Sequence, residues 1–256
     1  MKKFIRVLSL ALAVLMALTL VGCGTKDTNS DGAKKYVIYS DNAFAPFEFL
    51  DSETNKYIGV DMDLLAAIAE DQGFEYEMHN EGFNAAMGAV QAGQADAMIA
   101  GMSINDERKE TYDFSEGYFE DGSILVVAKD STIASPADLK GKVVAAKTGT
   151  TSTKYAESIK DEYGFSITYF EDSPTMYQAV INGTAVACFE DFSVIGWAIK
   201  NDNVALKTVG EVVNPCYYGF AVKKGKNAEL IEMFDKGLAN IKANGEYDKI
   251  LAKYGY

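Results

Sequence analysis

The sequence predicts an α/β fold of two lobes with a cleft between them. Apolar strand-like runs alternate with amphipathic helices over residues 36–101, in the order β-α-β-α-β. A similar series follows over residues 124–191. Such an order is typical of largely parallel sheets covered by helices on both faces, whose ligands bind beyond the carboxyl ends of the strands. In the first series, Asp41 and the stretch 101–108 fall at those ends.

The elements of the first series follow from local patterns. The apolar run 36–40 predicts a buried strand, and a loop is expected over 42–49. A stripe of apolar residues from Met62 to Ala69 predicts a helix over 61–71, which Gly73 should end. The series continues with a strand over 74–78, a helix over 84–92 and a strand over 96–101.

The second series begins with a strand over 124–128. Ser135 and Pro136 then start a short helix, as a cap and as the first helical residue. The remaining predicted strands are 142–147, 166–170, 185–189 and 204–209, and the remaining predicted helices are 153–163, 174–182, 192–200 and 228–253, the last broken near 244–245.

The N-terminus has the pattern of a targeting segment. Residues 1–6 are basic and residues 7–21 form an almost unbroken apolar run, shorter than the roughly 20 residues of a comfortable membrane span. The run ends in Leu20-Val21-Gly22-Cys23, which resembles the lipobox of bacterial lipoproteins. The prediction is a signal peptide over 1–22, lipidation of Cys23 and a polar tether over 23–34.

Charge and composition exclude several classes of function. Removal of residues 1–22, which contain three basic residues and no acid, would change the formal net charge from −13 to −16. So acidic a chain argues against nucleic acid as a partner and against electrostatic binding to anionic lipid. A buried cationic site stays compatible with this charge, which keeps Arg108 and Lys147 of interest.

Cysteine and histidine positions argue against metal and nucleophilic chemistry. A disulfide between Cys188 and Cys216 is possible outside the cytoplasm, but two buried thiols are favoured. No Cys/His cluster has metal-ligand spacing, and the single histidine, His79, is expected on a surface strand. We therefore expect no metal, no cofactor and no Ser-His-Asp or Cys-His machinery.

Two polar turns are candidates for a binding site. The stretch 100–109 offers a glycine carbonyl, the Ser103 hydroxyl and the Arg108 guanidinium, which suit a small zwitterion. Its alternative is a solvated helical turn capped by Asn105. The stretch 148–152 lacks the Gly-Lys-Ser/Thr ending of a Walker motif, but its amides and hydroxyls at a helix start form a seat for a carboxylate. Simple helix capping is the alternative here as well.

Taken together, these motifs resemble those of the family 3 extracellular solute-binding proteins, the polar-amino-acid-binding proteins of ATP-binding cassette importers. The matching segments are 41–49, 59–64, 100–108, 113–115, Tyr118, 147–151 and 185–191. They occur in order over nearly the whole chain after the tether. The resemblance implies a bilobed, type II periplasmic-binding-protein-like fold that closes around its ligand. It implies lobe 1 from 35–117 plus 219–256, hinge strands at 118–122 and 214–218, and lobe 2 from 123–213.

The resemblance also implies roles for individual residues. Arg108 would pair with the α-carboxylate of an amino acid, assisted by Thr151 and Ser103. Asp191 would face the α-ammonium together with the Gly101 carbonyl. The expected ligand-binding residues are Asp41, Phe44, Phe83, Gly101, Ser103, Arg108, Lys147, Thr151 and Asp191. Phe44 and Phe83 would sandwich the ligand side chain, although both also fit an ordinary core position.

The choice of ligand depends on the far end of the site. Lys147 with Asp41 is similar to the glutamine-binding subset, since the two suit the acceptor and the donor of a carboxamide. Glu190 could offset the repulsion between Lys147 and a basic ligand. The prediction is a monomeric binding protein for a neutral polar amino acid that serves a membrane permease. The alternatives are an enzyme on the same fold, such as a cyclohexadienyl-type dehydratase, and a ligand-sensing or adhesive lipoprotein.

Overall fold

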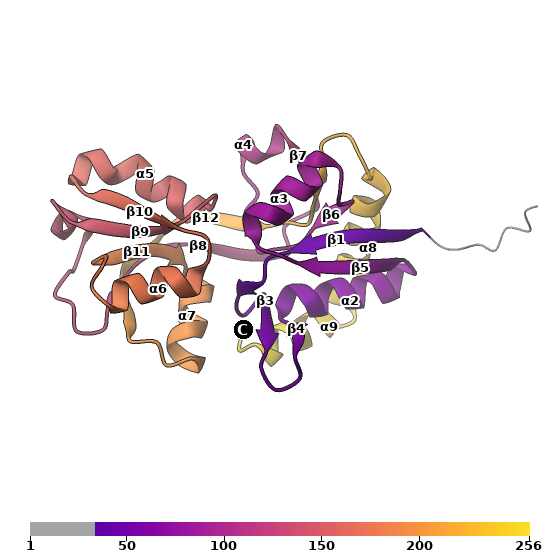
Figure 1. The fold of residues 1–256 in the computed structure, drawn as a ribbon. Helices are drawn as coiled ribbons and strands as arrows, with labels where there is room; N and C mark the ends of the chain where they lie inside the picture. The colour runs from indigo at the N-terminus through magenta and orange to yellow at the C-terminus, as the bar shows by residue number, and fades with distance from the viewer. Residues whose placement is uncertain (1–33) are drawn as a thin grey trace, which may run out of the picture. The chain divides into compact units, whose positions relative to one another are not determined.

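The computed structural model describes residues 34–256, which form two α/β lobes, each around a five-stranded sheet (Figure 1). Residues Lys35–Tyr256 form one compact unit. The first lobe contains strands β1 (Lys35–Ser40), β5 (Glu75–Asn80), β6 (Ala97–Met98), β7 (Tyr112–Phe114) and β13 (Ala221–Lys223), with helices α2 (Val60–Gln72), α3 (Phe83–Ala92), α4 (Asp106–Lys109), α8 (Ala228–Ala243) and α9 (Glu246–Lys253). Its sheet order is β5-β1-β6-β13-β7, and β1 is parallel to both β5 and β6.

The second lobe repeats this plan. It contains strands β8 (Phe119–Ala128), β9 (Val143–Lys147), β10 (Ser166–Phe170), β11 (Ala187–Asp191) and β12 (Leu206–Tyr218), the single 3₁₀ turn η1 (Pro136–Leu139), and helices α5 (Thr151–Tyr163), α6 (Ser173–Ile181) and α7 (Phe192–Asn201). The sheet order is β10-β9-β11-β8-β12, with β9 parallel to both of its neighbours and β8 antiparallel to both of its own. The predicted two-lobed α/β fold is confirmed. The expectation of largely parallel sheets was wrong, because β13 in the first lobe and β8 in the second each pair antiparallel with both of their neighbours.

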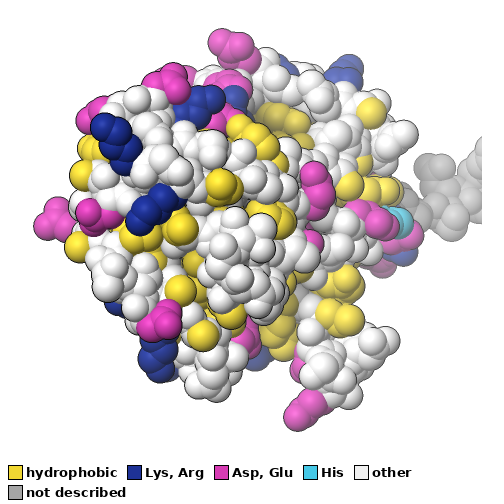
Figure 2. Space-filling view, turned by 60° about the vertical axis from the view of Figure 1, so that its left-hand side comes forward, with side chains coloured by type: hydrophobic (Ala, Val, Ile, Leu, Met, Phe, Trp, Pro, Cys, Tyr) yellow, Lys and Arg dark blue, Asp and Glu magenta, His cyan; other side chains and the backbone are white. Residues whose placement is uncertain are grey.

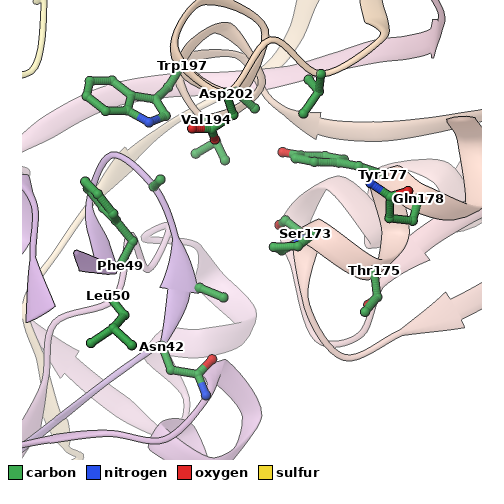
Figure 3. Close-up of a pocket in the computed structure, with 15 residues that line it drawn as sticks. Asn42, Phe49, Leu50, Ser173, Thr175, Tyr177, Gln178, Val194, Trp197 and Asp202 are labelled. Atoms are coloured by element: carbon green, nitrogen blue, oxygen red, sulfur yellow. The ribbon is translucent and has the colours of Figure 1, made fainter. Parts of the chain in front are cut away.

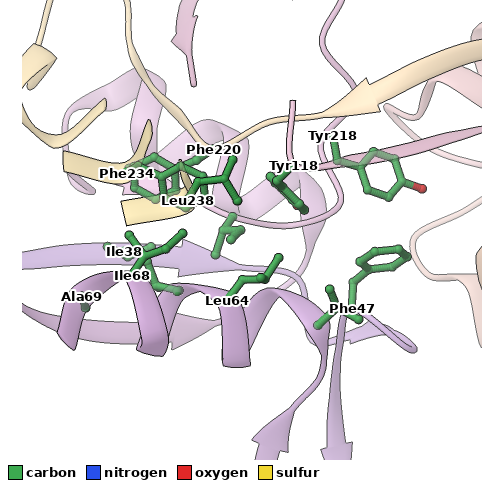
Figure 4. Packing of buried hydrophobic residues seen from close by; sticks show 14 of the residues in the cluster. Ile38, Phe47, Leu64, Ile68, Ala69, Tyr118, Tyr218, Phe220, Phe234 and Leu238 are labelled. Carbon is green, nitrogen blue, oxygen red and sulfur yellow. The ribbon is translucent and has the colours of Figure 1, made fainter. Parts of the chain in front are cut away.

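Each sheet is covered on both faces because its strands are apolar on both sides. In the first lobe, α2 and α8 cover one face, where Ile38, Leu64, Ile68 and Phe234 pack together, and α3 covers the other (Figure 4). The rings of Phe220 and Phe234 stack at 4.5 Å. In the second lobe, α6 and α7 pack on one face and α5 on the other. The strand ends therefore remain free to carry polar side chains.

Strands β8 and β12 carry the chain between the lobes. They pair antiparallel, with Cys216 opposite Asp121 and Tyr218 opposite Phe119. Tyr218 also forms an isolated bridge with Ser103 of the first lobe. The segments expected to act as hinges, 118–122 and 214–218, lie at this crossing; their action as hinges remains a prediction.

Several element boundaries differ from those expected. Residues expected to form a loop instead make a small antiparallel sheet of β2 (Ala43–Phe44), β3 (Glu48–Asp51) and β4 (Lys56–Ile58). Strand β6 is only two residues long because the chain turns at Gly101, where φ is +52°. Strand β11 begins at Ala187 rather than at 185, because the Ala185 amide still closes the end of α6 by donating to Ala179 O. Gly73 ends α2 in the left-handed conformation, as predicted.

The remaining features of the fold concern membrane spans, surface charge and the N-terminal segment. Within residues 34–256, no helix is both long and apolar enough to cross a bilayer. Acidic and basic side chains alternate on the face in Figure 2, with hydrophobic side chains between them. The predicted signal peptide, the predicted lipidation site Cys23 and almost all of the predicted tether lie outside the described residues.

Candidate functional site

A small cavity at the strand ends brings the predicted site residues together. It measures ≈ 10 Å³ and is lined by Phe44, Phe83, Ala100, Gly101, Ser103, Arg108, Lys147, Thr150, Thr151 and Asp191. Eight of the nine expected ligand-binding residues are in this lining. The ninth, Asp41, forms an ion pair with Lys147. Because the lining comes from both lobes and leaves so little room, the lobes or their side chains must move to admit any organic solute.

Arg108 lies in a capped helical turn, and its guanidinium lines the cavity. Asn105 caps the short helix α4 by accepting a hydrogen bond from the Arg108 amide at 2.8 Å. The guanidinium points the other way: Nη1 donates to Ser103 O at 2.8 Å, and Nη2 donates across the lobes to Gly149 O at 3.0 Å. Burial lowers the pKa of Arg108, and the nearby charge of Asp191 opposes that shift. The group is thus a partly desolvated cation, suited to bind an anion.

Asp191 supplies a negative charge in the same cavity. It lies at the end of β11 and accepts hydrogen bonds from Ser152 Oγ at 2.7 Å and from Tyr218 Oη at 2.5 Å. Burial raises its pKa, while these hydrogen bonds and the cations Lys147 and Arg108 oppose the shift. The site therefore holds a fixed cation and a carboxylate within one small, low-dielectric space.

Lys147 and Asp41 form a buried ion pair between the lobes. Lys147 ends β9 and Asp41 follows β1, and their Nζ and Oδ2 atoms lie 2.6 Å apart with 2% exposure of each side chain. Burial alone would lower the pKa of Lys147, but Asp41 and Glu190 outweigh it, so the pKa is raised. The ammonium also lies 4.5 Å from the centre of the Phe44 ring. Lys147 stays charged, and Asp41 is its partner.

Hydroxyl groups and the N-terminus of α5 complete the cavity. Ser103 Oγ and Thr151 Oγ1 lie 2.9 Å apart across the lobes. Thr150 caps α5 by accepting from the Thr153 amide at 3.1 Å, so Thr151 is the first helical residue. This positive end of the helix faces the cavity that Arg108 lines. The capping interpretation of the turn 148–152 is confirmed. Its use as an anion seat stays a prediction.

The family comparison agrees with this geometry. The family model for bacterial extracellular solute-binding proteins, family 3, matches residues 36–256. The chain belongs to this family. The predicted resemblance is confirmed over almost all of the described residues.

The similarity of this solute-binding protein to relatives and to solved structures of other proteins extends over nearly the full lengths of those proteins. A probable histidine-binding protein of Neisseria gonorrhoeae is 35% identical over 99% of this chain and 96% of its own. The substrate-binding domain 2 of Lactococcus lactis GlnP, in an open conformation, is 45% identical over 87% of this chain and 96% of its own, with a TM-score of 0.61. An ancestral arginine-binding protein bound to arginine is 36% identical over 87% and 98%, with a TM-score of 0.80.

A larger groove lies beside the cavity of this solute-binding protein. It measures ≈ 520 Å³ and is lined by residues of both lobes, including Asn42, Phe49, Ser173, Tyr177 and Trp197 (Figure 3). Asp202 is the only charged residue in its lining. A zwitterion buried there would meet no cation, so the smaller cavity is the stronger candidate site despite its size.

Some contributors to the site were not expected. Tyr218 and Ser152 hold the Asp191 carboxylate, and Asp61 accepts from the Gly101 amide at 2.8 Å. Asp61 lies within a segment that carries the family resemblance, which was the one available signal. Tyr218 gave none, because its contact with Asp191 depends on how β12 returns past β11.

Residue Glu190, whose role was left open, lies just behind the cavity. Its carboxyl group accepts from Tyr177 Oη at 2.9 Å and from the Asp191 amide at 3.0 Å. Burial, and then the charge of Asp191, raise the pKa of Glu190 to about 7, whereas Lys147 lowers it. Glu190 thus influences Lys147 through charge and is not part of the cavity lining.

The cysteine and histidine predictions have separate outcomes. Both Cys188 and Cys216 are free thiols, and Cys188 is buried, but Cys216 is only partly buried, so the expectation of two buried thiols was wrong for Cys216. The reason is that Cys216 lies on the outer strand β12. His79 is partly exposed on β5 and stacks on Tyr39 at 4.8 Å. Among the described residues, no group of His, Cys, Asp and Glu has the arrangement of a metal site.

Proposed function

We propose that this solute-binding protein captures an α-amino acid with a neutral polar side chain, L-glutamine or a close analogue, and delivers it to the permease of an ATP-binding cassette importer. The observation that carries the proposal is that Arg108 and Asp191 line one small cavity. A buried zwitterion needs an opposite charge at each end, because desolvation of an unpaired charge costs more than its other contacts return. Arg108 would bind the α-carboxylate and Asp191, with the Gly101 carbonyl, the α-ammonium.

The far end of the cavity favours a neutral side chain. Lys147 is charged, and its ammonium occupies the face of Phe44 on which a guanidinium side chain would otherwise stack. Asp41 neutralises Lys147 at 2.6 Å. A carboxamide can accept from Lys147 and donate to Asp41, whereas an additional cation would be repelled by Lys147 and an additional anion by Asp41.

Lobe closure would enclose the amino acid. The contacts of Arg108 with Gly149, of Lys147 with Asp41 and of Ser103 with Thr151 all join residues of different lobes. The structure is also more similar to the arginine-bound ancestral protein than to the open GlnP domain, although the latter has the higher sequence identity. Both observations support a closed arrangement here and an open one that admits the ligand.

The cellular setting of the proposal rests on the N-terminus. We infer cleavage after residue 22 and anchoring through lipidated Cys23, with residues 23–34 as a tether that lets a monomeric protein reach its permease. This placement outside the cytoplasmic membrane agrees with the name of the family. Neither nucleic acid nor a cofactor has a role in the proposed function.

Binding rather than turnover is the proposed outcome of capture. An enzyme would need an acid or base within reach of the substrate, with a pKa near the working pH. Glu190 has such a pKa, but its carboxyl group is held by Tyr177 and the Asp191 amide behind the cavity. A dehydratase or a sensing role on the same fold is the competing candidate, and an assay for product after incubation with each bound amino acid would reveal turnover.

The test is a thermal-shift screen of the common amino acids with two glutamine analogues. L-Glutamine at a hundred times its Kd should stabilise the protein by about 2.7 kcal/mol. 4-Carbamoylbutanoate lacks the α-ammonium and 4-aminobutanamide lacks the α-carboxylate, so neither should shift the melting temperature at the same concentration. The proposal would be contradicted if no amino acid raised the melting temperature, or if both analogues raised it as much as L-glutamine does.

A further inference from the structure

Two carboxyl groups lie buried together next to the backbone of the site. Glu48 of β3 and Asp61 of α2 both have 0% exposure, and their side chains interact with each other. Asp61 Oδ2 accepts hydrogen bonds from the Gly101 amide at 2.8 Å and from Tyr118 Oη at 2.9 Å. One carboxyl group therefore supports both the glycine of the candidate site and the first residue of the predicted hinge strand.

The donors around this pair are too few for two carboxylates. Both donors reach the same oxygen, Asp61 Oδ2, so that no N–H or O–H group from elsewhere in the described chain reaches Glu48 Oε1, Glu48 Oε2 or Asp61 Oδ1. Three buried acceptors without donors would each carry a desolvation penalty. A single proton between the two carboxyl groups satisfies two of these three oxygens, because the protonated group becomes a donor to the other. The third oxygen then belongs to a neutral acid, whose burial costs less than that of a carboxylate.

Charged groups on the neighbouring elements also favour a shared proton. Glu48 faces Asp61 on α2, Asp41 after β1 and Lys147 on β9, and Tyr118 faces both acids. Lys147, the only cation among these neighbours in the described part of the chain, already pairs with Asp41. Burial, then the charges of Asp61 and Asp41, raise the pKa of Glu48 well above its usual range, while burial raises that of Asp61 only to about 6. At neutral pH the proton therefore belongs to Glu48, and Asp61 is the carboxylate.

We propose that Glu48 and Asp61 share one proton at neutral pH and that this acid–carboxylate pair holds the Gly101 backbone where its carbonyl faces the bound ammonium group. The second half of this inference rests on the proposed function; the shared proton does not. Both residues are positioning residues, because they act on a ligand through Gly101.

The backbone at Gly101 has little room to move, so the hydrogen bond that holds it is important for the site. Its φ is +52°, and a Cβ placed there would lie 2.5 Å from Phe44 Cε1. The Gly101 backbone thus has a left-handed conformation and lies against the Phe44 ring. The hydrogen bond to Asp61 holds the Gly101 amide in place. A carboxylate acceptor makes that bond stronger than a neutral acid would.

The test begins with spectra that require no amino acid. In protein with ¹³C-labelled glutamate side chains at pH 7.5, the Glu48 carboxyl resonance should lie at the position of a protonated acid. It would be assigned by Glu48→Gln or, if that variant does not fold, by triple-resonance spectra of the unmodified protein. The Gly101 amide proton should shift with pH near 6, as Asp61 takes up a proton, and Asp61→Asn should abolish that shift. The exposed Glu53→Gln serves as the control and should change neither signal.

Affinity for L-glutamine provides the second readout. Glu48→Gln keeps a donor to Asp61 and should leave Kd within about threefold, whereas Glu48→Ala and Asp61→Asn should each weaken binding about tenfold, as for one charge-assisted hydrogen bond. A Glu48 resonance at the carboxylate position, or a Gly101 amide that does not titrate, would overturn the shared proton. Equal losses in Glu48→Gln and Glu48→Ala would overturn the positioning role. Absence of L-glutamine binding by the unmodified protein would contradict the proposed function and leave the spectra to decide the proton.

Discussion

Replacing Lys147 with methionine tests the ion pair that joins the lobes. Methionine keeps most of the side-chain length and removes the ammonium that lies 2.6 Å from Asp41 Oδ2. In the closed arrangement, Asp41 would then be a buried carboxylate that keeps only its contacts with the amides of Asn42 and Ala43. Breaking one side of a buried ion pair costs about 3–5 kcal/mol.

The lobes offer a way to avoid this cost, because Asp41 and Lys147 belong to different lobes. Opening returns Asp41 to water, so the penalty acts on closure rather than on folding of either lobe. About 3–5 kcal/mol corresponds to about two to four orders of magnitude in the closed population. The Kd for L-glutamine should rise by a similar factor, since the competent state becomes rare.

Isothermal titration calorimetry would measure the affinity, and small-angle scattering with and without L-glutamine would report closure. Lys154→Met is the matched control, because Lys154 also reaches across the lobes, to Glu107 at 3.2 Å, but both side chains are largely exposed. Exposed pairs contribute little, so this variant should bind normally. The double variant Asp41→Asn with Lys147→Met should recover part of the lost affinity. An affinity of Lys147→Met within about threefold of the unmodified protein would refute the role of the pair.

Three further predictions concern pH, backbone and anchoring. Burial raises the pKa of Glu190 to about 7 and that of Asp61 to about 6, so their stabilising contribution is complete at low pH and is lost as pH rises through 6–7. Urea denaturation should show a free energy of unfolding lower at pH 8 than at pH 5, by about 3 kcal/mol for Glu190 and about 1 kcal/mol for Asp61, and equal values would contradict the burial argument. Gly101→Ala should abolish amino-acid binding, because its Cβ would meet the Phe44 ring; calorimetry with retained affinity would disprove this. Cys23→Ala should move the protein from the membrane fraction to the medium or periplasm, and continued membrane association would argue against the lipid anchor.

Local patterns predicted the elements whose signals are local. The apolar stripe of α2 and its glycine stop, and the Ser135-Pro136 start of η1, depend on neighbouring residues alone. The ribbon β2-β3-β4 was not predicted, because its strands are two to four residues long and their pairing shows no clear alternation. The start of β11 was placed two residues early, since the sequence does not reveal that Ala185 still closes α6.

The site divides in the same way. Arg108, Ser103 and Thr151 lie in turns whose residue types predict a binding site from the sequence alone. The family resemblance added Asp41, Lys147 and Asp191 to the predicted site. Tyr218 could not be predicted, because its hydroxyl reaches Asp191 only through the crossing of β12. The pairing of Glu48 with Asp61 likewise depends on how β3 packs against α2.

The most direct test of the central claim is calorimetry of amino-acid binding to the unmodified protein and to Arg108→Ala. Lys109→Ala, an exposed change in the same short helix, is the control. L-Glutamine should bind the unmodified protein and Lys109→Ala with equal affinity, more tightly than L-arginine or L-histidine. Loss of the guanidinium should weaken binding by at least about two orders of magnitude, because the α-carboxylate would be buried without its partner. An unchanged affinity in Arg108→Ala would contradict the assignment of this cavity as the amino-acid site.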